Sequence, residues 1–243
     1  MMNHLEKFGA ATLLVVLSSM PAFAQNATST FACSQAAVNL DGDLDGFVDT
    51  DECAGLGGIT ICNGTTTRAN CIDPNGRDVF VLLVPAATAS NIPADPLSLI
   101  NQAVGGLNVA AHPVSANHVG TGRILIAPNS TQKVIRVTES KLTGSGILGV
   151  CEWGTPNGLD DCIVYTERAK AVAASMGLVA TDVIKWVINH EVGHALNLTA
   201  FEDPTIGHHE PAGSGFVMMS AMTKKSGAPR TFSEGSRTDV RLK

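Results

Sequence analysis

The chain has 243 residues, of which 44% are hydrophobic and 16% are charged, and its formal net charge is −6. This length is enough for one well-packed domain with a small appendage. A modest negative charge argues against nucleic acid as the partner, because proteins that bind nucleic acids carry basic surfaces.

The first 24 residues have the three parts of a secretory signal. A short charged start, Met1 to Lys7, precedes an apolar stretch at 8–20 that is too short to span a bilayer, and the small residues Ala22 and Ala24 follow. We expect cleavage after Ala24 and a secreted or periplasmic protein. An uncleaved membrane anchor is the alternative, and no later run approaches the length of a membrane span.

Six cysteines lie beyond this signal, and their even number predicts three disulfides in an oxidising compartment. Several pairings are possible. Local closure of the chain favours Cys33 with Cys53, Cys62 with Cys71, and Cys151 with Cys162.

An acidic loop at 41–52 matches the pattern D-x-D-x-D-G-x-x-D-x-x-E at every position. Loops of this pattern surround Ca²⁺ with carboxylates, one backbone carbonyl, a ligand that acts through water and a closing Glu, and a Gly makes the sharp turn. The corresponding residues are Asp41, Asp43, Asp45, Phe47 (through its carbonyl), Asp49 and Glu52, with Gly46 at the turn. We predict a calcium site here, and an acidic surface turn is the alternative.

The loop resembles those of EF-hand proteins and of dockerin-like or thrombospondin-like repeats, and the resemblance covers this loop only. Such loops usually come in pairs or arrays, whereas this chain has one copy, and Gly and Cys follow Glu52 within a few residues. The resemblance implies a structural calcium rather than a switching pair of helices, with Cys33 and Cys53 joining the two ends of the loop.

Four segments are expected along the chain. A signal at 1–24 is followed by a calcium-loop and disulfide-rich segment at 25–75 and by the main domain at 76–225. Basic residues outnumber acidic ones in 226–243, which we expect to be a solvated tail.

Within the main domain, the apolar run 79–84 predicts a strand buried on both faces. Asp95 before 96–104 and two glycines after it predict a helix there. Further strands are expected at 123–127, 133–138, 146–150 and 162–165, the last two forming a pair, and further helices at 166–178 and from 181 onward. This order predicts an α/β or α+β domain in which a mixed, twisted sheet packs on the last helix.

The last helix carries the pattern H-E-x-x-H, with His190, Glu191 and His194. Positions i and i+4 share one face of a helix, so the two histidines can hold one Zn²⁺, and Glu191 can reach a water on that metal. The alternative is a chance match, but the capping residue and apolar spacing before the motif favour a real helix. Gly193 costs about 1 kcal/mol in a helix relative to Ala, so close packing or a nearby substrate is expected to keep it there.

A catalytic zinc site needs a third protein ligand. In the metzincin pattern a Gly and a third His follow at places that here hold Asn197, which can make the left-handed turn that ends the helix, and Ala200, which cannot bind zinc. A histidine pair, His208 and His209, then precedes a Val-Met step.

The chain therefore resembles the metzincin-type secreted zinc metalloproteases, with an insertion before the third His as in leishmanolysin-like members. The resemblance covers about 76–225 and implies a metzincin-like catalytic domain in which His208, or His209, is the third ligand. It also implies that Met218 or Met219 is the methionine of the turn below the metal; ordinary core filling is the alternative for both.

The resemblance implies an endopeptidase whose zinc-activated water loses its proton to Glu191, with protein or peptide substrates. A gluzincin arrangement would instead use Glu210 as the third ligand. Two other classes stay open: a calcium-dependent extracellular binding module without catalysis, and a zinc hydrolase that is not a peptidase.

Overall fold

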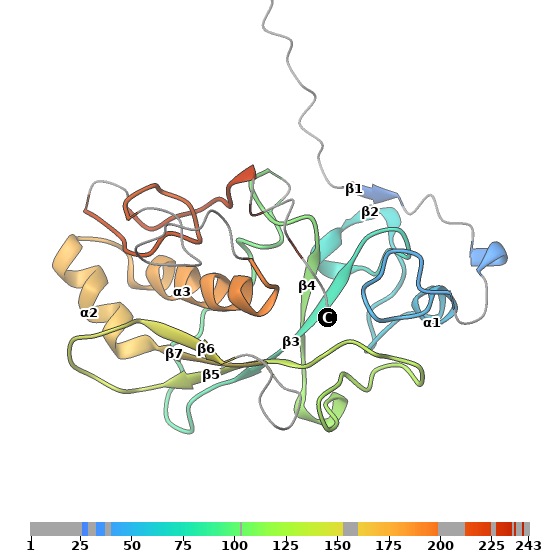
Figure 1. Ribbon diagram of the computed structural model, residues 1–243, viewed down its shortest axis with the longest axis horizontal. Coiled ribbons are helices and arrows are strands. Elements are labelled where there is room, and N and C mark those ends of the chain that lie inside the picture. The colour runs from blue at the N-terminus through green and yellow to red at the C-terminus, as the bar shows by residue number, and fades with distance from the viewer. Residues whose placement is uncertain are drawn as a thin grey trace, which may run out of the picture.

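The computed structural model describes residues 26–28, 33–36, 40–102, 104–152, 160–198, 212–224, 227–234, 236 and 240. Its centre is a five-stranded sheet in the order β4-β3-β5-β7-β6, with helix α3 lying along it (Figure 1). Four strands run parallel, and β6 pairs antiparallel with β7 at the edge. These strands are β3 (Asp78–Val84), β4 (Ala110–Val114), β5 (Ile135–Ser140), β6 (Gly149–Glu152) and β7 (Asp160–Tyr165).

A second, two-stranded sheet pairs β1 (Asn26–Thr28) with β2 (Asn63–Thr67). The helices are α1 (Asp49–Ala54), α2 (Thr166–Met176) and α3 (Ala180–Ala195). Three short 3-10 turns complete the described elements: η1 (Cys33–Gln35), η2 (Arg68–Asn70) and η3 (Ala116–His118). No helix among the described residues is both long and apolar enough to cross a bilayer.

Strand β3 contributes to a hydrophobic cluster on each face of the sheet, because successive side chains of a strand point to opposite sides. Val79 and Val81 belong to the larger cluster, which includes the buried side of α3. Phe80 belongs to a second cluster with Phe47, and their rings meet edge to face with centroids 5.2 Å apart. The amino-terminal segment therefore covers one side of β3, while the larger cluster, which includes the buried side of α3, lies on the other.

The mixed α/β class and the strand at 79–84 are confirmed, and the first five residues of β3 are buried. The pair expected at 146–150 and 162–165 corresponds to β6 and β7, and the helix expected at 166–178 corresponds to α2. Strand β5 begins two residues later than the run at 133–138 suggested. Strands β1, β2 and β4 and helix α1 were not predicted from the sequence.

Two predicted elements are wrong. Residues 96–101 form turns rather than a helix, because Asn189 of α3 satisfies their backbone: it accepts from Ile100 N (3.0 Å) and donates to Pro96 O (2.7 Å). Residues 123–127 make only isolated bridges, at Arg123 and Ile124. At 96–101, hydrogen bonds to the Asn189 side chain thus replace a bond that a local helix would make.

The three disulfides join the cysteines that local closure favoured: Cys33–Cys53, Cys62–Cys71 and Cys151–Cys162. The last of these links the paired strands β6 and β7 at opposing positions. In the segment expected to be a solvated tail, Phe232 and Val240 are buried in the larger cluster. The signal expected at 1–24 lies outside the described residues.

Glu139, near the end of β5, forms hydrogen bonds that connect this strand to the segment 86–91 and to the start of α2. Its carboxylate accepts hydrogen bonds from Ala86 N, Ser90 Oγ, Asn91 N and Thr166 Oγ1, and Lys141 Nζ lies 2.8 Å away. Burial alone would raise the pKa of Glu139, but the bonds from Lys141, Ser90 and the two backbone amides lower it from 4.5 to about 2.

The charged form of Glu139 therefore stabilises the fold above pH 4.5, and that contribution should be lost as pH falls from there toward 2. We expect Glu139→Gln to lower the free energy of unfolding by about 2–3 kcal/mol at pH 7 and to flatten its dependence on pH in that window. Urea unfolding between pH 2 and 7 measures both effects. Glu152→Gln, at an exposed position of β6, is the control; equal stability of the two variants at pH 7 would disprove this role.

Candidate active site

Helix α3 is buried through nearly all of its second half. The run Val183 to Ile188 packs into the larger cluster, and this holds the turn that follows against the sheet. His190, Glu191 and His194 retain exposures of 8%, 4% and 8%, so each polar head reaches only a narrow opening. Buried polar groups of this kind need partners or a ligand.

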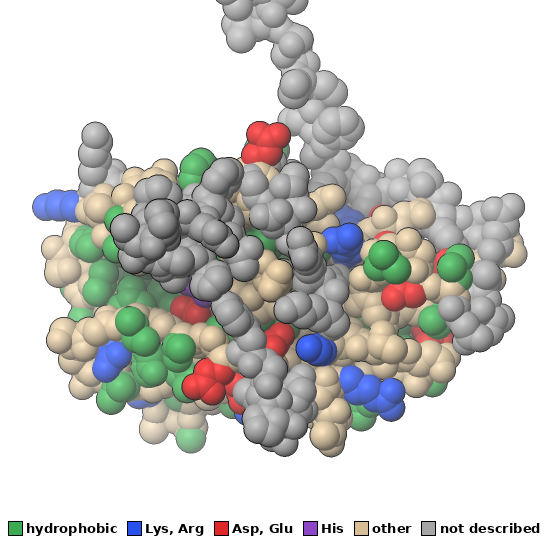
Figure 2. All heavy atoms as spheres, viewed as in Figure 1, with side chains coloured by type: hydrophobic (Ala, Val, Ile, Leu, Met, Phe, Trp, Pro, Cys, Tyr) green, Lys and Arg blue, Asp and Glu red, His purple; other side chains and the backbone are tan. Residues whose placement is uncertain are grey.

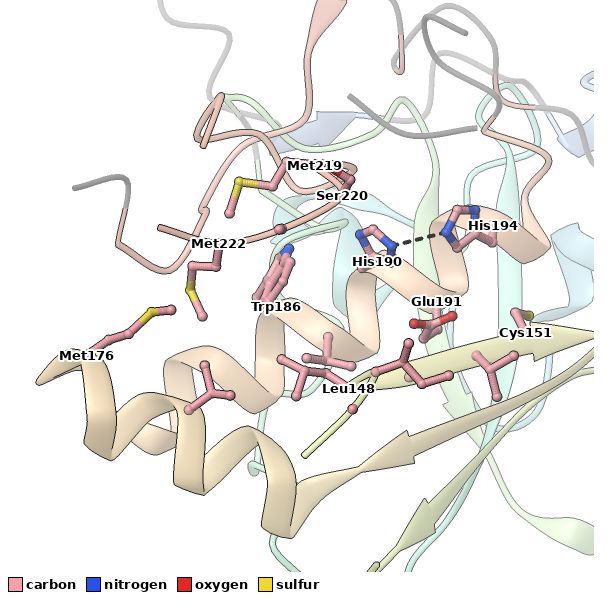
Figure 3. Close-up of a pocket in the computed structure, with 17 residues that line it drawn as sticks. Leu148, Cys151, Met176, Trp186, His190, Glu191, His194, Met219, Ser220 and Met222 are labelled. Carbon is pink, nitrogen blue, oxygen red and sulfur yellow. Dashed lines mark hydrogen bonds between the residues drawn. The ribbon is translucent and has the colours of Figure 1, made fainter. Parts of the chain in front are cut away.

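The two histidines face each other across one turn of α3, with their Nε2 atoms 3.0 Å apart (Figure 3). Nδ1 of His190 lies 2.8 Å from the carbonyl oxygen of Val217. Since a carbonyl oxygen only accepts, Nδ1 carries the proton and the lone pair of His190 is on Nε2. Such a bond on the opposite nitrogen is how proteins orient a metal-binding imidazole.

This spacing fits two ligands of one zinc ion. Nitrogens at 2.0–2.1 Å from a tetrahedral metal are about 3.3 Å apart, and a slight rotation of either ring would supply the difference. The described residues therefore provide two nitrogen donors that could hold a metal. His208, His209 and Glu210, the candidates for the third ligand, lie outside the described residues.

The segment 216–219 lies directly against the motif helix. The carbonyl oxygen of Val217 accepts from Trp186 Nε1 (2.8 Å) as well as from His190. Met218 is fully buried, and a Cβ built on Gly193 would lie 2.5 Å from its sulfur. Gly193 is therefore required for close packing between the helix and Met218, while Met219 lines the neighbouring cavity.

Helix α3 ends as the sequence suggested, at a left-handed Asn197 with φ 59°. Leu198 N donates to Gly193 O (3.0 Å) and Asn197 N donates to His194 O (2.8 Å). These two bonds form a Schellman cap. The cap ends the helix just after His194.

Glu191 points into the cavity beside the histidines, close to strand β6 (Figure 3). Burial raises its pKa to about 8. A Cβ on Gly149 would lie 2.3 Å from Glu191 Oε1 and 2.7 Å from its Cδ and Cγ. The absence of a side chain at Gly149 therefore makes the room that the Glu191 carboxylate occupies.

The cavity has a volume of about 550 Å³ and is mainly apolar. Its walls come from the segment 146–151, from α2, from α3 and from 219–222. Figure 2 shows hydrophobic side chains gathered on this side of the molecule, next to a histidine and acidic groups. The site thus combines two nitrogen donors, one carboxylate and an apolar space of a size that can take a side chain.

The acidic loop forms a second group of metal-binding side chains. Carboxylate oxygens of Asp41, Asp43 and Asp45 lie within 4.8 Å of one another. Leu44 (φ 63°) and Gly46 (φ 98°) are left-handed, so the chain turns sharply within the loop. Oxygens that ligate Ca²⁺ at 2.3–2.6 Å are up to about 5 Å apart, so this spacing fits such an ion.

The remaining loop residues do not lie in this first group of carboxylates. Glu52 forms a second group with Asp45 and with Asp78, the first residue of β3. Asp78 was not predicted as a ligand from the sequence. Oδ1 of Asp49 accepts from Gly42 N (2.9 Å), and the Phe47 ring lies in the core. An acidic residue at the start of a buried strand was the available signal for Asp78, because a buried charge needs a partner.

The loop carboxylates crowd one another. Burial, together with the neighbouring carboxylates, raises the pKa of Asp43 to about 7, of Asp45 to about 8 and of Glu52 to about 10. The described residues therefore place too little positive charge near these carboxylates to keep all of them ionised. A divalent cation is the ligand whose charge would compensate.

No protein-family model, no curated protein and no solved structure matches this chain.

Proposed function

We propose that the chain is an exported zinc-dependent endopeptidase. The observation that carries this proposal is the convergence of His190 Nε2 and His194 Nε2, 3.0 Å apart, beside the buried carboxylate of Glu191. The metzincin resemblance of the sequence supplies the reaction class, with His208 or His209 as the third ligand. The three disulfides fit an exported protein.

When bound, zinc would acidify a water molecule and polarise the scissile carbonyl. The residues of the chain do the rest. His190 is held in position by the Val217 carbonyl, and Gly193 lets Met218 pack below the same turn. Glu191 takes the proton of the attacking water and delivers it to the leaving amine, and the apolar walls around it limit the access of other water.

Strand β6 supplies a means of holding an extended peptide. In the part of the chain that the structure describes, β6 is one of the two outer strands of the central sheet, and Gly149, Val150 and Cys151 line the cavity. An extended segment can pair with such an edge through main-chain hydrogen bonds. We propose that a peptide lies along β6 and places an apolar side chain in the cavity between α2 and Met222.

We also propose that the 41–52 loop holds a structural Ca²⁺. Support comes from the three converging carboxylates and from Glu52, which is fully buried and has no hydrogen-bond partner for either carboxylate oxygen. Because Phe47 and Phe80 share one cluster, this ion would stabilise the packing of the loop on β3.

Purified full-length protein should cleave casein or an unstructured peptide library, with mass spectrometry locating the cuts, and a zinc chelator should abolish cleavage. We expect large apolar residues beside the cleaved bond. A protein that holds zinc but leaves all peptides intact would be a hydrolase of another class. A protein that holds calcium and no stoichiometric zinc would be a binding module, and either outcome would disprove the proposal.

The third ligand is tested separately with His208→Ala and His209→Ala. We expect His208→Ala to lose zinc and activity and His209→Ala to keep both, as measured by metal analysis of the purified variants. The reverse pattern would assign the ligand to His209. Retention of zinc by both variants would favour Glu210, which Glu210→Gln then tests.

A further inference from the structure

Asp78 lies where the acidic loop meets the sheet. Its backbone N–H donates to Asp45 Oδ2 (2.8 Å). Gln132 Nε2 donates both to Asp45 O (2.8 Å) and to Asp78 O (2.6 Å). The first residue of β3 is therefore fixed against the loop by backbone contacts that do not involve its own carboxylate.

The Asp78 carboxylate belongs to a second group of potential metal ligands. Oxygens of Asp45, Glu52 and Asp78 lie within 4.8 Å of one another, and the three residues are at most 1% exposed. Both Glu52 oxygens are buried without a hydrogen-bond partner. A buried carboxylate in that condition needs a cation if it is to remain charged.

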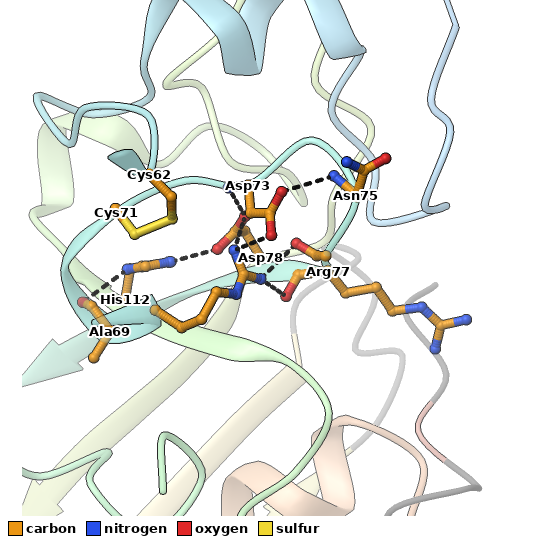
Figure 4. The surroundings of a disulfide bond; sticks show 10 residues. Cys62, Ala69, Cys71, Asp73, Asn75, Arg77, Asp78 and His112 are labelled. Atoms are coloured by element: carbon orange, nitrogen blue, oxygen red, sulfur yellow. Dashed lines mark hydrogen bonds and ion pairs between the residues drawn. A yellow bond between two sulfur atoms is a disulfide. The ribbon is translucent and has the colours of Figure 1, made fainter. Parts of the chain in front are cut away.

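Among the residues that the structure describes, no basic side chain forms an ion pair with Asp45 or Glu52. Arg68 directs Nη2 to the carbonyls of Gly76 (2.6 Å) and Arg77 (3.1 Å), and its Nη1 reaches Asp78 Oδ2 only at 3.4 Å. Nε2 of His112 lies 2.7 Å from Asp78 Oδ1, on the side of the Cys62–Cys71 disulfide (Figure 4). Oδ2 of Asp78 also accepts from Asp73 N (3.1 Å). Oδ1 has His112 as its one partner among the described residues, and since a carboxylate oxygen has two lone pairs, Oδ1 retains capacity for a metal.

We propose that Asp78 is a ligand, supplied from outside the loop, of the divalent cation held by Asp45 and Glu52. The cation then joins the amino-terminal segment to the first strand of the central sheet. His112 and Arg68 hold the Asp78 carboxylate in position. This inference rests on the proposed calcium site of the loop.

Calcium titration of full-length protein by isothermal calorimetry tests the proposal. Wild type should bind Ca²⁺, and Asp78→Asn, which keeps the size and the backbone contacts, should bind it at least about tenfold more weakly. Asp161→Asn is the matched control, because Asp161 is also an aspartate beside an arginine, Arg136, near the start of a strand, but lies outside both carboxylate groups. It should keep wild-type affinity.

Equal affinities of Asp78→Asn and wild type would overturn the role of Asp78 and leave the loop site intact. Absence of binding by wild type would overturn both. If Asp78→Asn fails to fold, a crystal structure of wild type grown with Ca²⁺ decides: an Asp78 oxygen at 2.3–2.6 Å from the ion, the range of calcium ligands, supports the proposal, and one beyond about 3.5 Å contradicts it.

Discussion

Replacing Glu191 with Gln should lower kcat/KM for peptide cleavage by about 10²–10⁴-fold, the usual contribution of a general base, and leave zinc in place. Gln has nearly the same shape, so the contact with Gly149 is retained while the proton acceptor is lost. Cleavage of a fluorogenic peptide, with metal analysis of the same samples, measures both quantities.

Glu234→Gln is the control for this experiment, because Glu234 is exposed, lies outside β6 and does not line the cavity. It should retain wild-type activity. A Glu191→Gln variant that contains zinc and cleaves as fast as wild type would remove Glu191 from the reaction.

Gly149→Ala should reduce kcat by at least about tenfold, because misplacing a catalytic group by about 1 Å can cost 10²-fold. The new Cβ would overlap Glu191 Oε1 at 2.3 Å, and the neighbouring Cδ and Cγ leave the side chain no room to stay in position. The three atoms nearest to this Cβ all belong to Glu191 and none to a histidine, so zinc content should be unchanged.

A split between KM and kcat distinguishes positioning of Glu191 from damage to the β6 edge. Loss of the edge would raise KM, whereas displacement of Glu191 would lower kcat. The fall in kcat caused by Gly149→Ala should also be larger than that caused by Val150→Ala, which shortens the neighbouring side chain on the same strand. Wild-type kcat for Gly149→Ala would contradict the assigned role.

The helix with its motif could be predicted because its signals are local. The spacing of His190 and His194 requires only a helix, and the left-handed turn at Asn197 follows from the short polar side chain of that residue. The pairs of cysteines were predictable for the same reason, since each pair is close in sequence.

Contacts between distant segments were not predictable in this way. Asn189 satisfies the backbone at 96–100 from α3, and nothing near residue 96 indicates that partner. Asp78 joins Asp45 and Glu52 only after β3 packs on the loop. Gly149 could be recognised as necessary only once Glu191 was seen beside it. Each of these depends on tertiary packing, which overrides local preference.

The zinc content of the purified full-length protein is the most direct test of the proposed function. Metal analysis should find one zinc per chain in wild type, and none after replacement of His190 and His194 by Ala, because their converging Nε2 atoms are two of the proposed ligands. Wild-type protein without zinc, or a double variant that retains it, would contradict the account.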